Sequence, residues 1–152
     1  MASLVMDTPL GALTLISDSG ALIALEWSDE HAAAVASPDG VLTTAAAQLT
    51  EYFAGQRRAF DLPLAPRGTP FRQKVWRAML DIPYGETRSY GDVARALESG
   101  PRAVGGACGA NPLPVIVPCH RILAAAGLGG YSGRGGLEVK QFLLRLEAQH
   151  RV

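Results

Sequence analysis

A thiol stands next to an imidazole at Cys119 and His120, in the stretch 115–122, VIVPCHRI, and such a pair is able to act as a nucleophile and its base. A cysteine reacts as its thiolate, so it needs a group that takes its proton. Histidine is the usual base for a cysteine nucleophile, which makes this pair a candidate for transfer onto sulfur. Neighbouring side chains of an extended segment point to opposite sides, so the proton would pass through a water or around a turn. The alternative is that Cys119 is a small buried hydrophobe at the end of a strand.

Composition limits the class of protein. The chain has 152 residues, 48% of them hydrophobic and 18% charged, which suits one domain with a sizeable core or two small lobes. No window has the roughly 18 apolar residues of a membrane helix, and the N-terminus lacks the pattern of a signal peptide. Two cysteines make neither a disulfide framework nor a structural zinc site. We therefore expect an intracellular protein with reduced thiols.

The net charge of zero hides an asymmetry between the two halves. Residues 1–66 contain 2 Lys and Arg against 8 Asp and Glu, a net charge of −6. Residues 67–152 contain 12 against 6, a net charge of +6. A basic half suits a polyanionic partner such as nucleic acid. The alternative is an ordinary drift of surface charge along the chain.

The first half predicts a small antiparallel sheet and a helix. Short apolar runs separated by turn residues are typical of hairpins, and they occur at 4–6, 13–16 and 22–27. Apolar residues at helical spacing in 41–54, closed by Gly55, predict a helix. Residues 58–62 are expected to form one more strand. Two prolines and a glycine in 63–68 predict a linker, at the point where the charge changes sign.

The second half is predicted to be mostly helical. Helix starts are expected at Thr69-Pro70, at Ser89 with Asp92 three residues later, and at Pro101. The last two predicted helices are short and are joined by a turn at Ser99-Gly100, a pattern typical of a helix-turn-helix. Apolar residues in 139–146 predict a final amphipathic helix.

Four motifs in the second half resemble, in order, those of the O6-alkylguanine-DNA alkyltransferases. They are IPYGETRSY at 82–90, RAVGGA at 102–107, NPLPVIVPCHR at 111–121, and a tail with GYSG at 130–133, Lys140 and LLRLE at 143–147. The resemblance implies an α/β (α+β) protein of two parts. Residues 1–66 would form a small antiparallel-sheet, ribonuclease-H-like lobe, and residues 67–152 a helical domain that binds DNA through the helix-turn-helix and transfers the alkyl group.

The resemblance also implies a reaction. The thiol of Cys119 would take the alkyl group from O6 of a flipped guanine in one displacement that is not reversed. His120 would deprotonate Cys119 through a water, and Glu147 would orient His120. Tyr90 would help to rotate the nucleotide and offer its hydroxyl to the departing base, and Asn111 would hold the turn of the site. The alternatives are a solvated charge at the helix end for Glu147, a core tyrosine for Tyr90 and a plain helix stop for Asn111.

Contacts with DNA follow from the same resemblance. The residues expected to make them are Ser89, Tyr90, Arg102, Ala103, Gly105 and Arg121. Arg102 would fill the hole left by the flipped base; the alternatives are a phosphate contact or a surface charge. Adjacent Gly105 and Gly106 are costly in a helix and suggest close approach of the DNA backbone, or tight packing on another helix. The residues expected to line the alkylguanine pocket are Ile122, Tyr131 and Ser132.

The implied partner is double-stranded DNA that contains alkylated guanine, bound by a monomer without a cofactor. Some relatives hold zinc in the N-terminal lobe, but this chain has no cysteine before Cys108, so no metal is expected. The expected setting is the bacterial cytoplasm, with association to the nucleoid when the protein is bound to DNA. The range of alkyl groups stays open, because the stretch between Arg121 and Tyr131 is about one residue shorter than is usual in the family. The sequence does not say whether O4-alkylthymine is accepted.

Two other classes of function compete with alkyl transfer. Alkyltransferase-like proteins recognise alkylated bases without chemistry, but they replace the cysteine, so Cys119 argues against that class. A thiol hydrolase would use Cys119 and His120 on a small acyl substrate, and the helix-turn-helix and the basic half argue against it. Turnover separates these classes, because an alkyltransferase stops after one equivalent.

Overall fold

The computed structural model describes residues 1–28, 40–124 and 136–150. The chain divides into two compact units, Met1–Arg67 and Gly68–Val152. Among the described residues, no helix is both long and apolar enough to cross a lipid bilayer.

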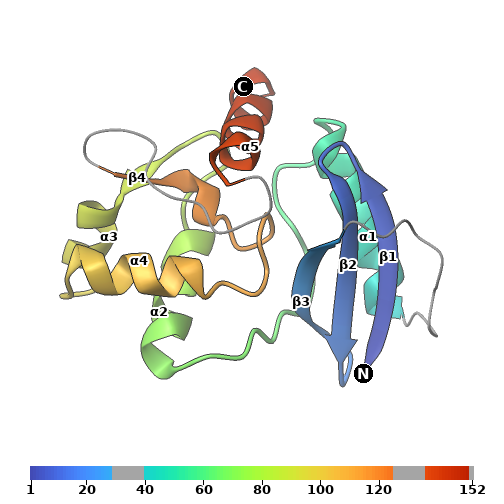
Figure 1. Ribbon diagram of the computed structural model, residues 1–152, viewed down its shortest axis with the longest axis horizontal. Coiled ribbons are helices and arrows are strands. Elements are labelled where there is room, and N and C mark those ends of the chain that lie inside the picture. The colour runs from blue at the N-terminus through green and yellow to red at the C-terminus, as the bar shows by residue number, and fades with distance from the viewer. Residues whose placement is uncertain (29–39, 125–135, 151–152) are drawn as a thin grey trace. The chain divides into compact units, whose positions relative to one another are not determined.

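The N-terminal unit is built on a three-stranded antiparallel sheet (Figure 1). Its strands are β1 (Ala2–Thr8), β2 (Gly11–Asp18) and β3 (Ala21–Ser28), in the order β1-β2-β3. The turn between β2 and β3 has positive φ at both central residues, 52° at Ser19 and 81° at Gly20, as the tight hairpin turn with the twist of the strands requires. The antiparallel sheet expected from the apolar runs is confirmed.

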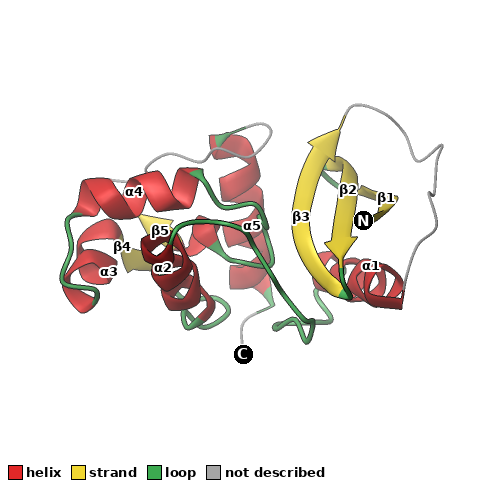
Figure 2. Cartoon of the chain, turned by 90° about the horizontal axis from the view of Figure 1, so that it is seen from below, coloured by secondary structure: helices red, strands yellow, loops and turns green. Residues whose placement is uncertain are grey.

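Helix α1 (Gly40–Phe53) packs against the sheet of this unit (Figure 2). Alternate residues of β2 point to the helix, so Leu13 and Leu15 are fully buried while Thr14 between them is not. Residues three and four apart on α1 complete the core, as its predicted periodicity requires. The fully buried residues of α1 are Leu42, Ala45, Leu49 and Tyr52.

Residues 58–62 form no strand, so that prediction is wrong. The backbone of Asp61 pairs with the side-chain amide of Gln48 and not with another strand. Gln48 Nε2 donates to the Asp61 carbonyl (3.1 Å) and Gln48 Oε1 accepts from the Asp61 N–H (2.9 Å). These bonds satisfy the backbone of Asp61, which then needs no neighbouring strand. The only ladder contact of the linker is further on, where Leu64 forms an isolated parallel bridge with Leu22 within the described residues.

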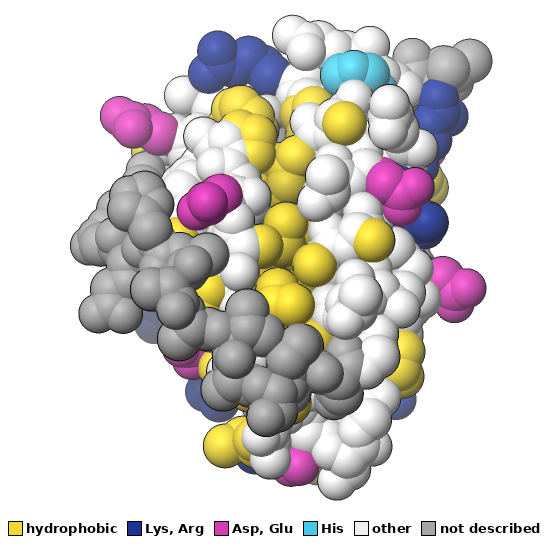
Figure 3. Space-filling model, turned by 90° about the vertical axis from the view of Figure 1, so that its right-hand side faces the viewer, with side chains coloured by type: hydrophobic (Ala, Val, Ile, Leu, Met, Phe, Trp, Pro, Cys, Tyr) yellow, Lys and Arg dark blue, Asp and Glu magenta, His cyan; other side chains and the backbone are white. Residues whose placement is uncertain are grey.

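Some hydrophobic side chains remain at the surface of the protein. The residues of β1 are mostly half-buried, and Figure 3 shows a face of the molecule on which hydrophobic side chains form a central band, with charged side chains toward its margins. Exposed apolar side chains are normal on small proteins, because there is too little polar surface to cover them.

The C-terminal unit begins with α2 (Pro70–Leu80). Thr69 caps it, because its hydroxyl accepts from the Arg72 N–H at 3.2 Å, and Pro70 occupies the first turn as predicted. The indole N–H of Trp76 donates to the Ala107 carbonyl at 2.9 Å in the core. Gly68 makes room for that indole, since a Cβ there would lie 2.4 Å from the ring.

Helices α3 (Tyr90–Ala96) and α4 (Pro101–Gly109) form the helix-turn-helix (Figure 1). Ser89 and Asp92 make the predicted capping box: the Ser89 hydroxyl accepts from the Asp92 N–H (2.9 Å), and the Asp92 carboxylate accepts from the Ser89 N–H (3.0 Å). Two features were not predicted. They are the 3₁₀ helix η1 (Cys119–Arg121) and the parallel pair of short strands β4 (Arg88–Ser89) and β5 (Ile122–Leu123). The final helix, α5 (Leu137–Gln149), is present as expected.

Candidate active site

The segment before Cys119 is a strained turn held by Asn111. Val115 has φ of 74°, which is costly for a β-branched residue. The Asn111 amide donates to the Val117 carbonyl and its oxygen accepts from the Leu113 N–H, both at 2.9 Å. Asn111 thus bridges the turn on both sides, which is the geometry expected of a residue that holds the site in shape.

Cys119 begins η1 and is 7% exposed, so its thiol is near the surface of the core without being open to solvent. The segment is not extended at this point, because the Arg121 N–H bonds back to the Pro118 carbonyl at 2.9 Å. The placement of Cys119 at the end of an extended strand is therefore wrong. In this 3₁₀ turn the side chains of His120 and Arg121, which are neighbours in sequence, both reach Glu147.

His120 is fully buried and uses one ring nitrogen. Its Nε2 lies 2.5 Å from Glu147 Oε2, and its Nδ1 has no hydrogen-bond partner among the described residues. Burial lowers the pKa of His120, Glu147 opposes that shift, and Arg121 and Lys140 add to it. The ring is therefore neutral near pH 7, with Nδ1 free to accept a proton.

Glu147 is 1% exposed, so a solvated charge at the helix end is wrong. Burial alone would raise the pKa of its carboxyl, but hydrogen bonds and charges from His120 and Arg121 lower it to about 2. The N–H of Gly85 also donates to Glu147 Oε1, at 3.3 Å. The carboxylate is thus ionised and held in place behind the imidazole.

The two cysteines lie close enough to influence one another, and they differ in what they can do. Burial, and after it the charge of Cys119, raises the pKa of Cys108 to about 12, so Cys108 stays a thiol at neutral pH. Lys140 lies near both thiols; burial lowers its pKa, and Cys119 and Cys108 oppose that shift. Its Nζ donates to the Ile122 carbonyl at 2.7 Å. In the sequence, the only sign of this buried ammonium is the place of Lys140 in a motif.

Tyr90, the first residue of α3, is half-buried on the side of the thiols. Burial raises the pKa of its hydroxyl, and Cys108 and Cys119 raise it further. The phenol therefore keeps its proton at neutral pH and can donate a hydrogen bond. Of the predicted catalytic residues, the structure brings His120 and Glu147 into contact, with Cys119 next to His120 in η1, and places Tyr90 within electrostatic reach of the thiol.

Helix α4 presents two different faces. Arg102, Ala103 and Gly106 are exposed, whereas Val104, Ala107 and Cys108 are buried. A Cβ at Gly106 would meet nothing within 4 Å, and one at Gly105 would only reach Tyr90 at 4.0 Å. Tight packing on another helix therefore does not explain the paired glycines, and the exposed face of α4 is smooth and open. Ser89 uses its hydroxyl oxygen in the cap of α3.

Arg121 does not lie where a DNA contact would need it, and this prediction is corrected. Its side chain is 8% exposed and pairs with Glu147, with Nε 2.8 Å from Oε1. Ile122 is fully buried, so its place in the alkylguanine pocket stays a prediction. Tyr131 and Ser132 lie outside the described residues.

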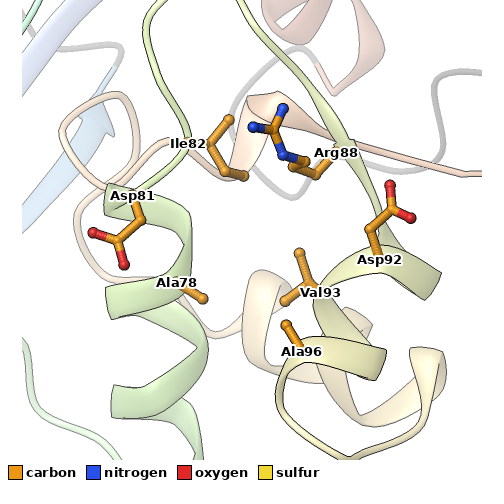
Figure 4. A pocket seen from close by; sticks show the side chains of 7 residues that line it. All are labelled: Ala78, Asp81, Ile82, Arg88, Asp92, Val93 and Ala96. Atoms are coloured by element: carbon orange, nitrogen blue, oxygen red, sulfur yellow. The ribbon is translucent and has the colours of Figure 1, made fainter.

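A hollow of about 450 Å³ opens between the C-terminal end of α2 and helix α3 (Figure 4). Ala78, Ile82, Val93 and Ala96 form its apolar part, and Asp81, Arg88 and Asp92 lie at its rim. None of the predicted site residues lines it, although the carbonyl of one lining residue, Ile82, accepts a hydrogen bond from Arg121.

Comparisons with known proteins match the whole described architecture. Residues 70–149 match the family model described as "6-O-methylguanine DNA methyltransferase, DNA binding domain", and residues 1–66 match its "ribonuclease-like domain". The chain is 46% identical over 149 residues to the methylated-DNA–protein-cysteine methyltransferase of Mycobacterium bovis, covering 93% of this chain and 89% of that protein. It is 44% identical over 154 residues to the constitutive enzyme of that name from Bacillus subtilis, covering 93% and 92%.

Solved structures of the same family are similar to this chain over nearly its whole length. The O6-methylguanine methyltransferase of Mycobacterium tuberculosis is similar with a TM-score of 0.86 at 42% identity, over 99% of this chain and 94% of that one. M. tuberculosis OGT in complex with DNA is similar with a TM-score of 0.85 at 46% identity, over 96% and 92%. The two-part fold expected from the sequence is confirmed.

Proposed function

The chain belongs to the 6-O-methylguanine DNA methyltransferase family, and we propose that it repairs O6-alkylguanine in DNA by moving the alkyl group onto Cys119. It is a methylated-DNA–protein-cysteine methyltransferase that binds DNA. DNA binding and alkyl transfer are assigned to residues 67–152. The observation that carries the assignment of the acceptor is the buried array of Cys119, His120 and Glu147.

The reaction begins with a proton transfer from the Cys119 thiol. Glu147 occupies Nε2 of His120, so Nδ1 is the nitrogen that receives the proton. Because Nδ1 makes no direct bond to a described residue, a water carries the proton from sulfur to nitrogen. The imidazolium that results is stabilised by the Glu147 carboxylate, as in other cysteine nucleophiles with a histidine base and a third orienting group.

The thiolate then attacks the alkyl carbon of the flipped guanine. A carbon–sulfur bond forms on Cys119 as the bond from that carbon to O6 breaks, and its electron pair stays with the guanine. The Tyr90 hydroxyl, whose pKa is raised by burial and by the thiols, donates a hydrogen bond to the departing base. The leaving guanine takes up one proton through the Tyr90 hydroxyl and is released neutral, and the proton that His120 accepted from Cys119 makes up for it. The thioether is stable, so each molecule reacts once.

DNA is bound through the helix-turn-helix. The exposed face of α4 carries Arg102, Ala103 and Gly106, and the open space beside both glycines lets a DNA backbone come close. Arg102 enters the duplex at the position of the flipped base, and Ser89 and Tyr90 lie at the start of the adjoining helix. The partner is double-stranded DNA with an alkylated guanine, bound by a monomer in the bacterial cytoplasm. Phosphate contacts make the affinity fall with salt.

The test measures the substrate. A duplex with one O6-methylguanine is incubated in excess over the full-length protein, and the modified base is counted after hydrolysis of the DNA. The expected result is loss of one equivalent per protein molecule, followed by a plateau. Continued loss beyond one equivalent would contradict the proposal in favour of a turning-over enzyme. Binding without loss would leave a protein that only recognises alkylated bases.

A further inference from the structure

Each of the three guanidinium nitrogens of Arg121 donates a hydrogen bond within the C-terminal unit. Nε donates to Glu147 Oε1 at 2.8 Å and Nη2 to Oε2 at 3.1 Å, a two-pronged pair with one carboxylate. Nη1 donates to the Ile82 carbonyl at 2.7 Å. The guanidinium carbon also lies 5.7 Å from the centre of the Tyr84 ring. Such bidentate pairs fix orientation as well as distance, which a point charge does not.

These contacts fix the carboxylate that holds the base. Glu147 accepts from Arg121 on both oxygens, from His120 on Oε2 and from the Gly85 N–H on Oε1. Arg121, which lies in η1, is therefore bound both to Glu147 of α5 and to the Ile82 carbonyl in the loop after α2. An uncompensated carboxylate buried to this degree would be costly, so the pair with Arg121 is needed for the ionised form to persist.

Arg121 also sets the charge around His120. From α5, Glu147 and Lys140 act on the imidazole, and from η1 Arg121 does so. The loop after α2 contributes neutral groups, the Gly85 N–H and the Tyr84 ring. Arg121 offsets the negative charge of Glu147 before any proton moves. Without that offset, the carboxylate would draw a proton from solvent onto His120, and a protonated imidazole cannot take the proton of Cys119.

We propose that Arg121 is a positioning residue of the transfer reaction, whose guanidinium fixes the Glu147 carboxylate and balances its charge so that His120 rests as a neutral base. This inference rests on the proposed function of Cys119 and His120. It replaces the DNA contact expected of Arg121 from the sequence. The effect of Lys140 on His120 has the same sign, as burial and both cations lower the pKa of the imidazole.

The test compares Arg121→Met and Arg121→Lys with the unchanged protein. The single-turnover rate of methyl transfer is measured from acid to alkaline pH, and the His120 imidazole is titrated by NMR without DNA. In Arg121→Met the pH below which the rate falls should rise by about one unit or more, together with the NMR midpoint, because a neighbouring cation has been removed. Arg121→Lys should keep that pH but lose about 10- to 100-fold in rate, because an ammonium cannot make the two-pronged pair.

The chain offers a matched control. Arg57 makes a related pattern at the surface of the N-terminal unit, with a single bond to a carboxylate (Nε 3.0 Å from Glu51 Oε1) and Nη1 3.0 Å from the Ala59 carbonyl. Arg57→Met should leave both the rate and its pH profile unchanged.

Three outcomes would overturn the proposal. Arg121→Met could lower the rate equally at every pH with the His120 midpoint unmoved, which is a purely structural effect. Arg121→Met could instead weaken DNA binding and leave the transfer rate unchanged, which would mean that Arg121 contacts DNA. If Arg121→Met does not fold, a rise in the pH of the acid fall-off in Arg121→Lys contradicts the proposal instead. Failure of the unchanged protein to transfer methyl would overturn the proposed function, but the NMR midpoints would still test Arg121.

Discussion

Within the described residues, the N-terminal unit buries two polar side chains, Ser17 and Gln48, and both are neutral, whereas those buried in the C-terminal unit are ionisable. The latter are His120, Arg121, Lys140 and Glu147. Burying a charge costs several kcal/mol unless partners compensate it, and apolar residues would usually serve stability as well. The polar interior of the first unit therefore supports its fold, and we infer that the ionisable interior of the second serves the proposed chemistry at Cys119.

The largest effect should come from removing the base. His120→Gln keeps a donor for Glu147 but cannot accept a proton, so the single-turnover rate of methyl transfer should fall by about 100-fold or more. The matched control is His150→Gln, since His150 lies at the end of α5 and bonds the Leu146 carbonyl at 2.9 Å. An unchanged rate in His120→Gln would break the contrast between the units, because the buried charges would then serve the fold alone.

Acid should act on the C-terminal unit through Glu147. The pKa of this carboxyl is about 2 in the folded protein against an ordinary 4.5. A lowered pKa contributes stability that is fully present above about pH 4.5 and is lost as the pH falls toward 2, about 3 kcal/mol in all. The lowered pKa of His120 acts in the same direction, starting below its ordinary 6.5.

Urea unfolding at several pH values checks this. Glu147→Gln should start from a lower free energy of unfolding at pH 7 and lose less of it in acid. Glu51→Gln, at the surface pair with Arg57, should follow the unchanged protein. Equal acid sensitivity of the unchanged protein and Glu147→Gln would contradict the role of this carboxylate.

A smaller effect is expected from the polar interior of the N-terminal unit. Gln48→Ala leaves the Asp61 N–H and carbonyl without their partners, so the free energy of unfolding should fall by about 1–3 kcal/mol. The methyl-transfer rate of the folded protein should not change. Gln56→Ala, at an exposed position, is the control and should do neither. A slower transfer step in Gln48→Ala at full occupancy of the folded state would mean that the units are not separate in function.

Local sequence signals predicted much of the fold. Ser19-Gly20 specifies its hairpin turn, Thr69-Pro70 a helix start, and Ser89 with Asp92 a capping box, because each acts over two to four residues. The strand expected at 58–62 failed because Gln48, more than ten residues away, satisfies the backbone there. Local propensity cannot register such a partner.

In the candidate site too, contiguous residues were predictable from the sequence, whereas contacts between residues distant in sequence were not. The motif around Cys119 and His120 is contiguous and was found from the sequence, and the resemblance supplied Glu147. The role of Arg121 was missed, because its partners Ile82 and Glu147 are 39 and 26 positions away. Lys140 was noted only as part of a motif, and its burial against the Ile122 carbonyl depends on the packing of α5.

Mass spectrometry that follows the methyl group onto the protein shows directly whether Cys119 is the acceptor. The unchanged protein, Cys119→Ser and Cys108→Ser are incubated with excess O6-methylguanine duplex, and intact mass is followed by peptide mapping. Cys108 is the matched buried thiol, with a pKa raised to about 12. We expect the unchanged protein and Cys108→Ser to gain one methyl group, on Cys119, and Cys119→Ser to gain none. A methyl group on Cys108, or a gain that persists in Cys119→Ser, would contradict the assignment of Cys119 as the acceptor.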